Sequence, residues 1–136
     1  MYTHQTKLRV RYGETDQMGY VYYGNYAQFF EIGRVEMLRS LGLSYRAMEE
    51  KGIMLPVMEY NVKYIKPAFY DDEIIIHTTI SELPGIKIKF DYEIFNEKND
   101  LLTKAHTTLV FVKKTDMKPT IAPQDLREQL ELKGLK

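Results

Sequence analysis

The chain has 136 residues, enough for one domain, and its 19 basic and 19 acidic side chains leave a formal net charge of zero. This balance gives no sign of a basic face for nucleic acid. Cysteine is absent, which excludes disulfides, a thiolate nucleophile and any cysteine-ligated metal site. There is no apolar run of membrane-spanning length and no apolar N-terminal stretch typical of a signal peptide. We therefore expect a single domain over residues 1–136, in the cytoplasm, with neither a membrane nor a nucleic-acid partner.

The N-terminal part of the chain predicts one strand followed by two helices. Apolar and charged residues alternate over Thr6–Tyr12, as in a half-buried strand. Tyr26–Leu41 is apolar on nearly every side, which is typical of a helix buried in a core. Gly33 in that helix costs about 1 kcal/mol relative to alanine, so we expect a sheet to approach the helix backbone closely there. Ser44 is a candidate cap for a short helix over Tyr45–Lys51.

The rest of the chain predicts four strands in an antiparallel meander, followed by a short helix over 123–132. Only one apolar helix is available to cover the resulting sheet. This pattern predicts an α+β domain in which a five-stranded antiparallel sheet curls around the long helix. The four strands are expected over Met54–Pro67, Glu73–Ser81, Ile86–Ile94 and Leu102–Lys113.

The most informative segment lies between the first strand and the long helix. It runs from Tyr12 to Tyr26 with the sequence YGETDQMGYVYYGNY. Its one aspartate, Asp16, comes shortly before the start of the helix, where free backbone N–H groups would stabilise an oxyanion. Glycines at Gly19 and Gly24 would let the backbone approach a substrate closely. The segment therefore offers a carboxylate for nucleophilic or general-base chemistry together with donors for developing negative charge.

This segment resembles the signature of the hotdog-fold acyl-CoA thioesterases of the 4-hydroxybenzoyl-CoA thioesterase type. The likeness continues through Gly52–Val57 and Pro67–Glu73, in the same order and with similar spacing. The resemblance implies the hotdog fold and hydrolysis of an acyl-CoA to a carboxylic acid and free CoA, without a cofactor or a metal. It also implies a homodimer or a homotetramer, with the active site at the interface between subunits.

The resemblance also implies roles for individual residues. It places the catalytic carboxylate at Asp16, acting as nucleophile or as general base. It places the N–H group that polarises the thioester carbonyl at or next to Tyr23, with Gly24 as a second donor. Tyr23 is aromatic where the bacterial short-chain branch commonly has histidine. Substrate-binding residues are expected at Gly19, Tyr22, Asn25 and Tyr26, with Lys87 and Lys89 as candidates for the CoA phosphates.

The remaining charged residues near the motif are given structural roles. Glu14, two residues before Asp16, is interpreted as a solvated acid or as an edge residue. Glu31 and Arg34 are three residues apart on one helix and predict an ion pair. The three histidines have no partners at ligand spacing, so no metal site is predicted, and the first of them, His4, is expected in a frayed terminus.

Two other functions stay open at this point. Hydrolysis of acyl groups from acyl carrier protein uses the same thioester chemistry, but an acidic carrier protein would favour a basic groove at the mouth of the site. A hotdog module that binds acyl-CoA without hydrolysing it is the second alternative. The sequence does not indicate which acyl chain is preferred.

Overall fold

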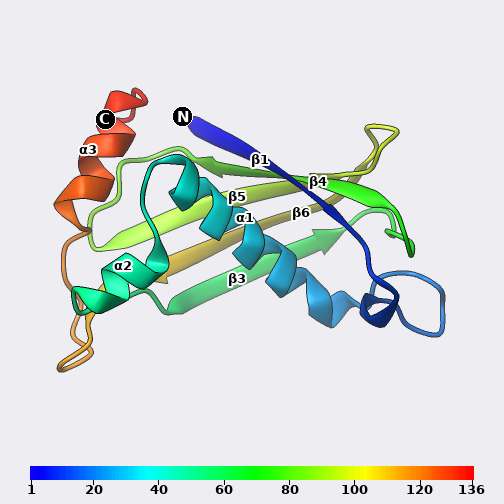
Figure 1. The fold of residues 1–136 in the computed structure, drawn as a ribbon, viewed down its shortest axis with the longest axis horizontal. Coiled ribbons are helices and arrows are strands. Elements are labelled where there is room, and N and C mark those ends of the chain that lie inside the picture. Colours follow the sequence, from blue (N-terminus) through cyan, green and yellow to red (C-terminus); the bar gives the residue numbers. More distant parts are fainter.

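The computed structural model describes residues 1–136 and contains a five-stranded antiparallel sheet with a long helix across one face (Figure 1). This arrangement confirms the predicted α+β architecture. None of the helices has the length and apolar character needed to cross a membrane. In spatial order the strands are β1 (Tyr2–Arg9), β4 (Glu73–Ile80), β5 (Lys87–Phe95), β6 (Leu101–Val110) and β3 (Val57–Tyr64).

The smaller elements frame this sheet. The long helix is α1 (Tyr26–Ser40), and the short helix α2 (Tyr45–Glu50) follows it, capped by Ser44 as predicted. A two-stranded sheet pairs β2 (Ile53–Met54) with β7 (Val112–Lys113), and α3 (Gln124–Leu132) ends the chain. Figure 1 shows α3 and both termini at the end of the sheet opposite to the loop that follows β1.

The predicted meander is wrong for one strand. Only β4, β5 and β6 are consecutive neighbours, whereas β3 pairs with β6 at the outer edge and β4 lies next to β1. The connection 65–72 therefore crosses from one side of the sheet to the other. It contains Pro67, which has no N–H to donate to a hairpin ladder. Its next residues bind the loop after β1 instead, since the carbonyl of Ala68 accepts from the N–H of Val21 at 2.8 Å.

Three predicted strand boundaries are also wrong. The first strand is Tyr2–Arg9, and His4 lies opposite Thr78 in β4 rather than in a frayed terminus. The long strand expected from Met54 splits at Pro56 into β2 and β3, because proline interrupts the ladder. The last expected strand splits at Phe111 into β6 and β7.

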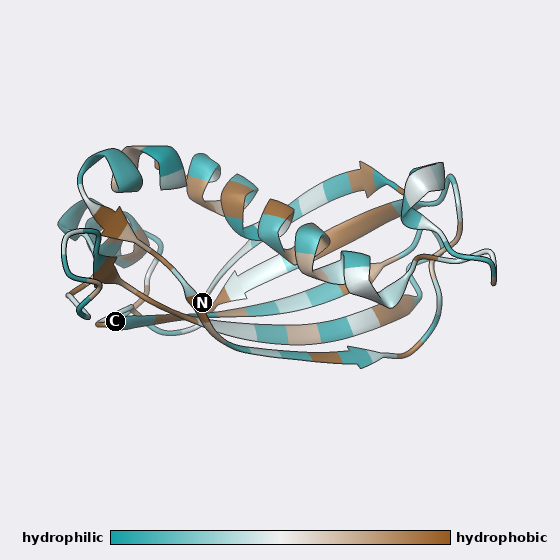
Figure 2. Ribbon diagram, turned by 90° about the horizontal axis from the view of Figure 1, so that it is seen from below, coloured by the Kyte–Doolittle hydropathy of each residue, from teal (hydrophilic) through white to brown (hydrophobic).

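The helix and the sheet meet closely at Gly33, as predicted. A Cβ atom at this position would lie 2.5 Å from Oγ1 of Thr78 on β4, so only glycine fits there without displacement. Figure 2 shows α1 lying across the sheet, with hydrophobic and hydrophilic residues alternating along the helix and along the strands. The apolar side chains between these two layers are fully buried and include Phe29, Phe30, Met37, Ile74, Ile76, Phe90 and Ile94.

The predicted ion pair between Glu31 and Arg34 does not form. Arg34 is only 8% exposed and donates from Nη1 to the hydroxyl of Tyr92 on β5 at 3.0 Å, whereas Glu31 is exposed. Burial raises the pKa of Tyr92 to about 12 although Arg34 lowers it in part, and its oxygen also lies 2.7 Å from Oγ1 of Thr107. The helix thus turns Arg34 toward the sheet and Glu31 toward solvent.

Candidate active site

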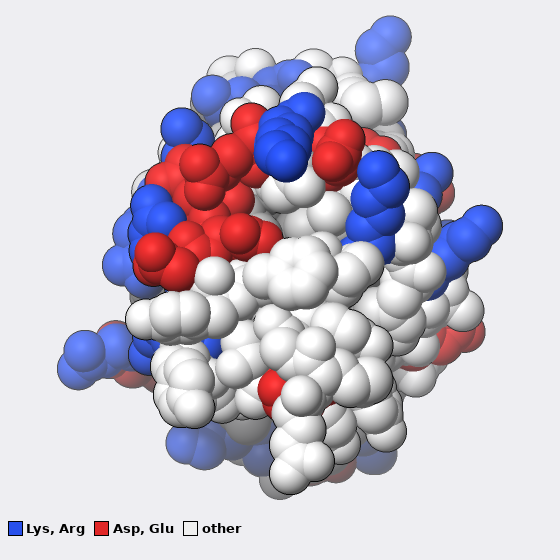
Figure 3. Space-filling model, turned by 90° about the vertical axis from the view of Figure 1, so that its right-hand side faces the viewer, with Lys and Arg blue, Asp and Glu red and all other residues white.

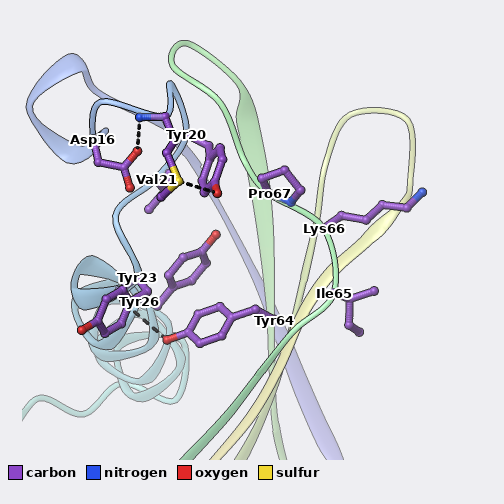
Figure 4. Close-up of a pocket in the computed structure, with 10 residues that line it drawn as sticks. Asp16, Tyr20, Val21, Tyr23, Tyr26, Tyr64, Ile65, Lys66 and Pro67 are labelled. Atoms are coloured by element: carbon purple, nitrogen blue, oxygen red, sulfur yellow. Dashed lines mark hydrogen bonds between the residues drawn. The ribbon is translucent and has the colours of Figure 1, made fainter.

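The loop after β1 folds back on itself and holds Asp16 through its backbone. A 3₁₀ turn, η1 (Tyr12–Glu14), precedes it. The N–H of Asp16 donates to the carbonyl of Tyr20 at 3.0 Å, and Gly19 has a φ of +86° that favours glycine. The N–H of Met18 donates to Oδ1 of Asp16 at 2.9 Å (Figure 4). Oδ2 of Asp16 accepts no hydrogen bond within the chain, so one carboxylate oxygen is left unpaired.

A second 3₁₀ turn, η2 (Tyr23–Asn25), leads directly into α1. The N–H of Tyr22 donates to the carbonyl of Glu14 at 2.9 Å, and the N–H of Asn25 donates to the carbonyl of Tyr22 at 2.9 Å. Between them, the N–H groups of Tyr23 and Gly24 have no acceptor in the chain. Unpaired N–H groups at the start of a helix are suitable donors for an oxyanion.

Asp16 and Tyr23 line the same cavity, which has a volume of about 450 Å³ (Figure 4). The cavity lies between the loop after β1, the start of α1 and the end of β3 with the connection that follows it. Seven of its ten lining residues are hydrophobic, which suits an apolar ligand held by a few polar groups. The lining residues are Asp16, Met18, Tyr20, Val21, Tyr23, Tyr26, Tyr64, Ile65, Lys66 and Pro67.

Residues 10–130 match the family model of the thioesterase-like superfamily. The chain belongs to this superfamily. This chain is 39% identical to YneP of Bacillus subtilis, a protein named as a candidate acyl-CoA thioesterase, over 88% of this chain and 86% of YneP. It is 35% identical to the acyl-CoA thioester hydrolase YbgC of Escherichia coli, over 88% of this chain and 89% of YbgC.

A solved structure agrees with these sequence matches. The DHNA-CoA thioesterase of Staphylococcus aureus superposes with a TM-score of 0.93 at 36% identity, covering 98% of this chain and 92% of that one. The comparisons confirm the family and the hotdog fold that the sequence resemblance implied. The protein is therefore a thioester-hydrolysing enzyme.

Not every expected site residue of the thioesterase lines the cavity. The structure brings Asp16, Tyr23 and Tyr26 together there, whereas Tyr22 is exposed, with its ring 4.8 Å from the ring of Tyr23. The side chain of Asn25 donates from Nδ2 to the carbonyl of Glu14 at 2.9 Å. Asn25 therefore ties the start of the helix to the Asp16 loop. Direct binding of substrate by Gly19, Gly24, Tyr22 or Asn25 stays a prediction.

The two lysines expected to bind CoA lie at the other end of the chain's sheet. Lys87 begins β5 opposite Val110, and Lys89 lies opposite Thr108. Within one chain, neither lines the Asp16 cavity. The lysine that does so is Lys66, whose Nζ lies 3.8 Å from Oδ2 of Asp100. Figure 3 shows the end of the molecule that carries the loop after β1, where acidic side chains gather beside a broad uncharged area.

Sequence reasoning missed the wall formed by Tyr64, Ile65 and Lys66. These residues reach the cavity because β3 pairs with β6 and its continuation runs toward the Asp16 loop, where Tyr20 bridges to Phe69. The only sequence signal was the adjacent family-like segment that begins at Pro67. Burial raises the pKa values of both Tyr26 and Tyr64, so each phenol carries its proton at neutral pH.

Proposed function

We propose that this thioesterase hydrolyses acyl-CoA thioesters to a carboxylic acid and free CoA, with Asp16 as the reacting carboxylate. The observation that carries this proposal is that Asp16 and Tyr23 line one largely apolar cavity, and that the N–H of Tyr23 has no acceptor in the chain. The names of the Bacillus and Escherichia relatives support an acyl-CoA substrate. A cytoplasmic location is consistent with such a substrate, because CoA thioesters are made and used inside cells.

Two routes are chemically consistent with this arrangement. In the first, Oδ2 of Asp16 attacks the thioester carbonyl, the C–S bond breaks, and the CoA thiolate takes a proton from water. Water then hydrolyses the resulting mixed anhydride and restores Asp16. In the second, Asp16 takes a proton from water as that water attacks the carbonyl, and the proton passes to the leaving thiolate.

Both routes place negative charge on the former carbonyl oxygen. The N–H of Tyr23, with that of Gly24 as a second donor, would donate hydrogen bonds to this oxygen as the charge develops. Loss of one such donor typically lowers kcat by about 10²- to 10³-fold. The free N–H groups are therefore as important to the proposal as the carboxylate itself.

The test is CoA release from short, long and aromatic acyl-CoAs, including DHNA-CoA, by the wild type and Asp16→Asn. We expect Asp16→Asn to lower kcat by about 10²- to 10⁴-fold, because the acid–base or nucleophilic group is lost. Glu14→Gln is the matched control, since Glu14 is the neighbouring acid and its carboxylate binds Arg11 instead.

Turnover by Asp16→Asn close to that of the wild type would refute the role of Asp16. Hydrolysis of acyl groups only from acyl carrier protein would correct the substrate class. Binding of acyl-CoA without turnover by the wild type would make the protein a binding module.

We also propose that the enzyme is a homodimer, or a tetramer built from such dimers, joined along β3. This edge strand has exposed residues on both faces, and its exposed apolar side chains include Val57, Met58, Tyr60 and Tyr64. An unpaired apolar edge is an aggregation hazard unless another chain covers it. Sedimentation analysis should give at least twice the chain mass of 16.1 kDa. A monomer at micromolar concentration would contradict this.

A further inference from the structure

Tyr64 connects the edge strand to the turn that carries the free N–H groups. It is the last residue of β3 and lies opposite Thr103 of β6. Its hydroxyl donates to the carbonyl of Tyr23 at 3.4 Å, and its ring lines the cavity that Asp16 lines (Figure 4). The Tyr23 carbonyl also accepts the N–H of Tyr26, so it is bound from two sides.

The ring of Tyr64 rests on a rigid support. It meets the ring of Tyr26 edge-on, with centroids 5.2 Å apart, and Tyr26 is itself only 3% exposed. Tyr26 in turn packs edge-on against Phe29 in the core. The phenol of Tyr64 therefore meets the turn from a fixed direction although the residue is 48% exposed.

We propose that Tyr64 is a positioning residue for hydrolysis, in addition to forming a wall of the acyl cavity. This inference rests on the proposed function. The carbonyl of Tyr23 and the N–H of Gly24 belong to one planar peptide group, and the N–H of Tyr23 is one Cα atom away. Anchoring the carbonyl fixes this group, and with it the orientation of the N–H donors before the substrate arrives. Donors fixed in advance stabilise developing charge without reorganising at the moment of reaction.

The protonation state of Tyr64 is compatible with this role. Burial, followed by the nearby phenol of Tyr23, raises the pKa of Tyr64 above its usual value of about 10. The hydroxyl therefore stays a donor at neutral and mildly alkaline pH.

The decisive kinetic variant is Tyr64→Phe, which removes the hydroxyl and keeps the ring. We expect kcat to fall about three- to tenfold, the effect of one neutral hydrogen bond, while KM stays within about twofold. Tyr60→Phe is the matched control. Tyr60 lies on the same strand, does not line the cavity, and its hydroxyl makes no hydrogen bond within the chain. An unchanged kcat in Tyr64→Phe would overturn the positioning role.

A separate variant tests whether the ring of Tyr64 forms a wall of the acyl cavity. Tyr64→Ala removes the ring as well, and we expect it to raise KM for the preferred acyl-CoA above the value for Tyr64→Phe. Equal KM values in the two variants would overturn the wall role.

A measurement without turnover separates this inference from the proposed function. The amide ¹H and ¹⁵N shifts of Tyr23 and Gly24 should change in Tyr64→Phe and stay at wild-type values in Tyr60→Phe. Unchanged shifts in Tyr64→Phe would overturn the anchoring contact. A wild type that hydrolyses no thioester would refute the proposed function, and the amide shifts would still decide whether Tyr64 anchors the turn.

Discussion

At the end of the sheet near α3, the side chains Phe111, Leu126 and Leu130 are almost completely buried. At the opposite end, the N–H groups of Tyr23 and Gly24 have no acceptor, and several tyrosines are exposed. Both residues are exposed and Tyr23 lines the cavity, so their N–H groups are open to solvent or to a ligand there. The comparison contrasts an end of the chain that stabilises the fold with the end where we propose that substrate binds and reacts.

The largest effect that tests this separation is the loss of Asp16. Asp16→Asn should abolish most turnover, as argued above, and leave the free energy of unfolding within about 0.5 kcal/mol of the wild type, since no core contact is lost. Urea unfolding of the two proteins measures this. A large loss of stability would show that Asp16 also maintains the fold, and the division between the two ends would fail.

Phe111→Ala is the opposite change, at the α3 end. Phe111 has no exposed surface, and its truncation should lower the free energy of unfolding by about 3–5 kcal/mol through lost burial and a new cavity. The kcat of the fraction that remains folded should be unchanged. Ile121→Ala is the control, because Ile121 is 58% exposed in the adjacent segment. A Phe111→Ala protein of normal stability but reduced kcat would break the comparison.

The protein should lose stability in alkali because of Tyr92, which is buried in the middle of the sheet. The pKa of Tyr92 is raised to about 12 in the folded protein, against about 10 when unfolded. Below pH 10 the phenol of Tyr92 keeps its proton in both the folded and the unfolded state, so the free energy of unfolding does not change. Between pH 10 and 12 only the unfolded state loses the proton, so the free energy of unfolding falls, by about 2–3 kcal/mol in total. Urea unfolding across this range measures the fall, and Tyr92→Phe should reduce its slope. An unchanged slope would show that Tyr92 is not responsible.

The smallest effect concerns the lysines at the two ends. Lys66→Ala should raise KM for acyl-CoA about two- to fivefold, the range for an exposed charge pair, and the effect should shrink at high salt. Lys87→Ala and Lys89→Ala are expected to matter only if a partner subunit brings β5 near the cavity. A larger KM effect from either of them than from Lys66 would place the CoA phosphates along β5.

The sequence pattern was sufficient to predict the elements whose structure depends on residues close in the chain. Helix α1 ends within one residue of its predicted bounds, and Gly33 contacts the sheet as expected. The position of β3 was not predictable, because it depends on where the connection 65–72 finds its hydrogen bonds. Arg34 was misjudged for the same reason, since its partner Tyr92 lies 58 residues away and no helical spacing rule includes it.

In the candidate site too, the residues close together in the sequence were predictable and those brought in by tertiary contacts were not. The continuous motif was sufficient to predict that Asp16 and Tyr23 lie together, and both line the cavity, while their roles stay predictions. Tyr64 and Lys66 were not predicted, because only tertiary contacts bring the end of β3 to the loop after β1. The roles expected for Lys87 and Lys89 came from the family's strand order and concern a location that a single chain does not bring near Asp16.

The connection 65–72 combines cavity-lining side chains with a fixed backbone. Its first part, Ile65 and Lys66, lines the cavity and lies outside the strands. The backbone is anchored in both parts. The N–H groups of Ile65 and Lys66 donate to the carbonyl of Leu102 at 2.8 and 3.0 Å, and the carbonyl of Ala68 accepts from Val21. Substitutions of the side chains of Ile65 and Lys66 should reshape the proposed acyl cavity, while these backbone hydrogen bonds keep the connection and the Asp16 loop in place. Directed evolution of acyl specificity should therefore begin at these two positions.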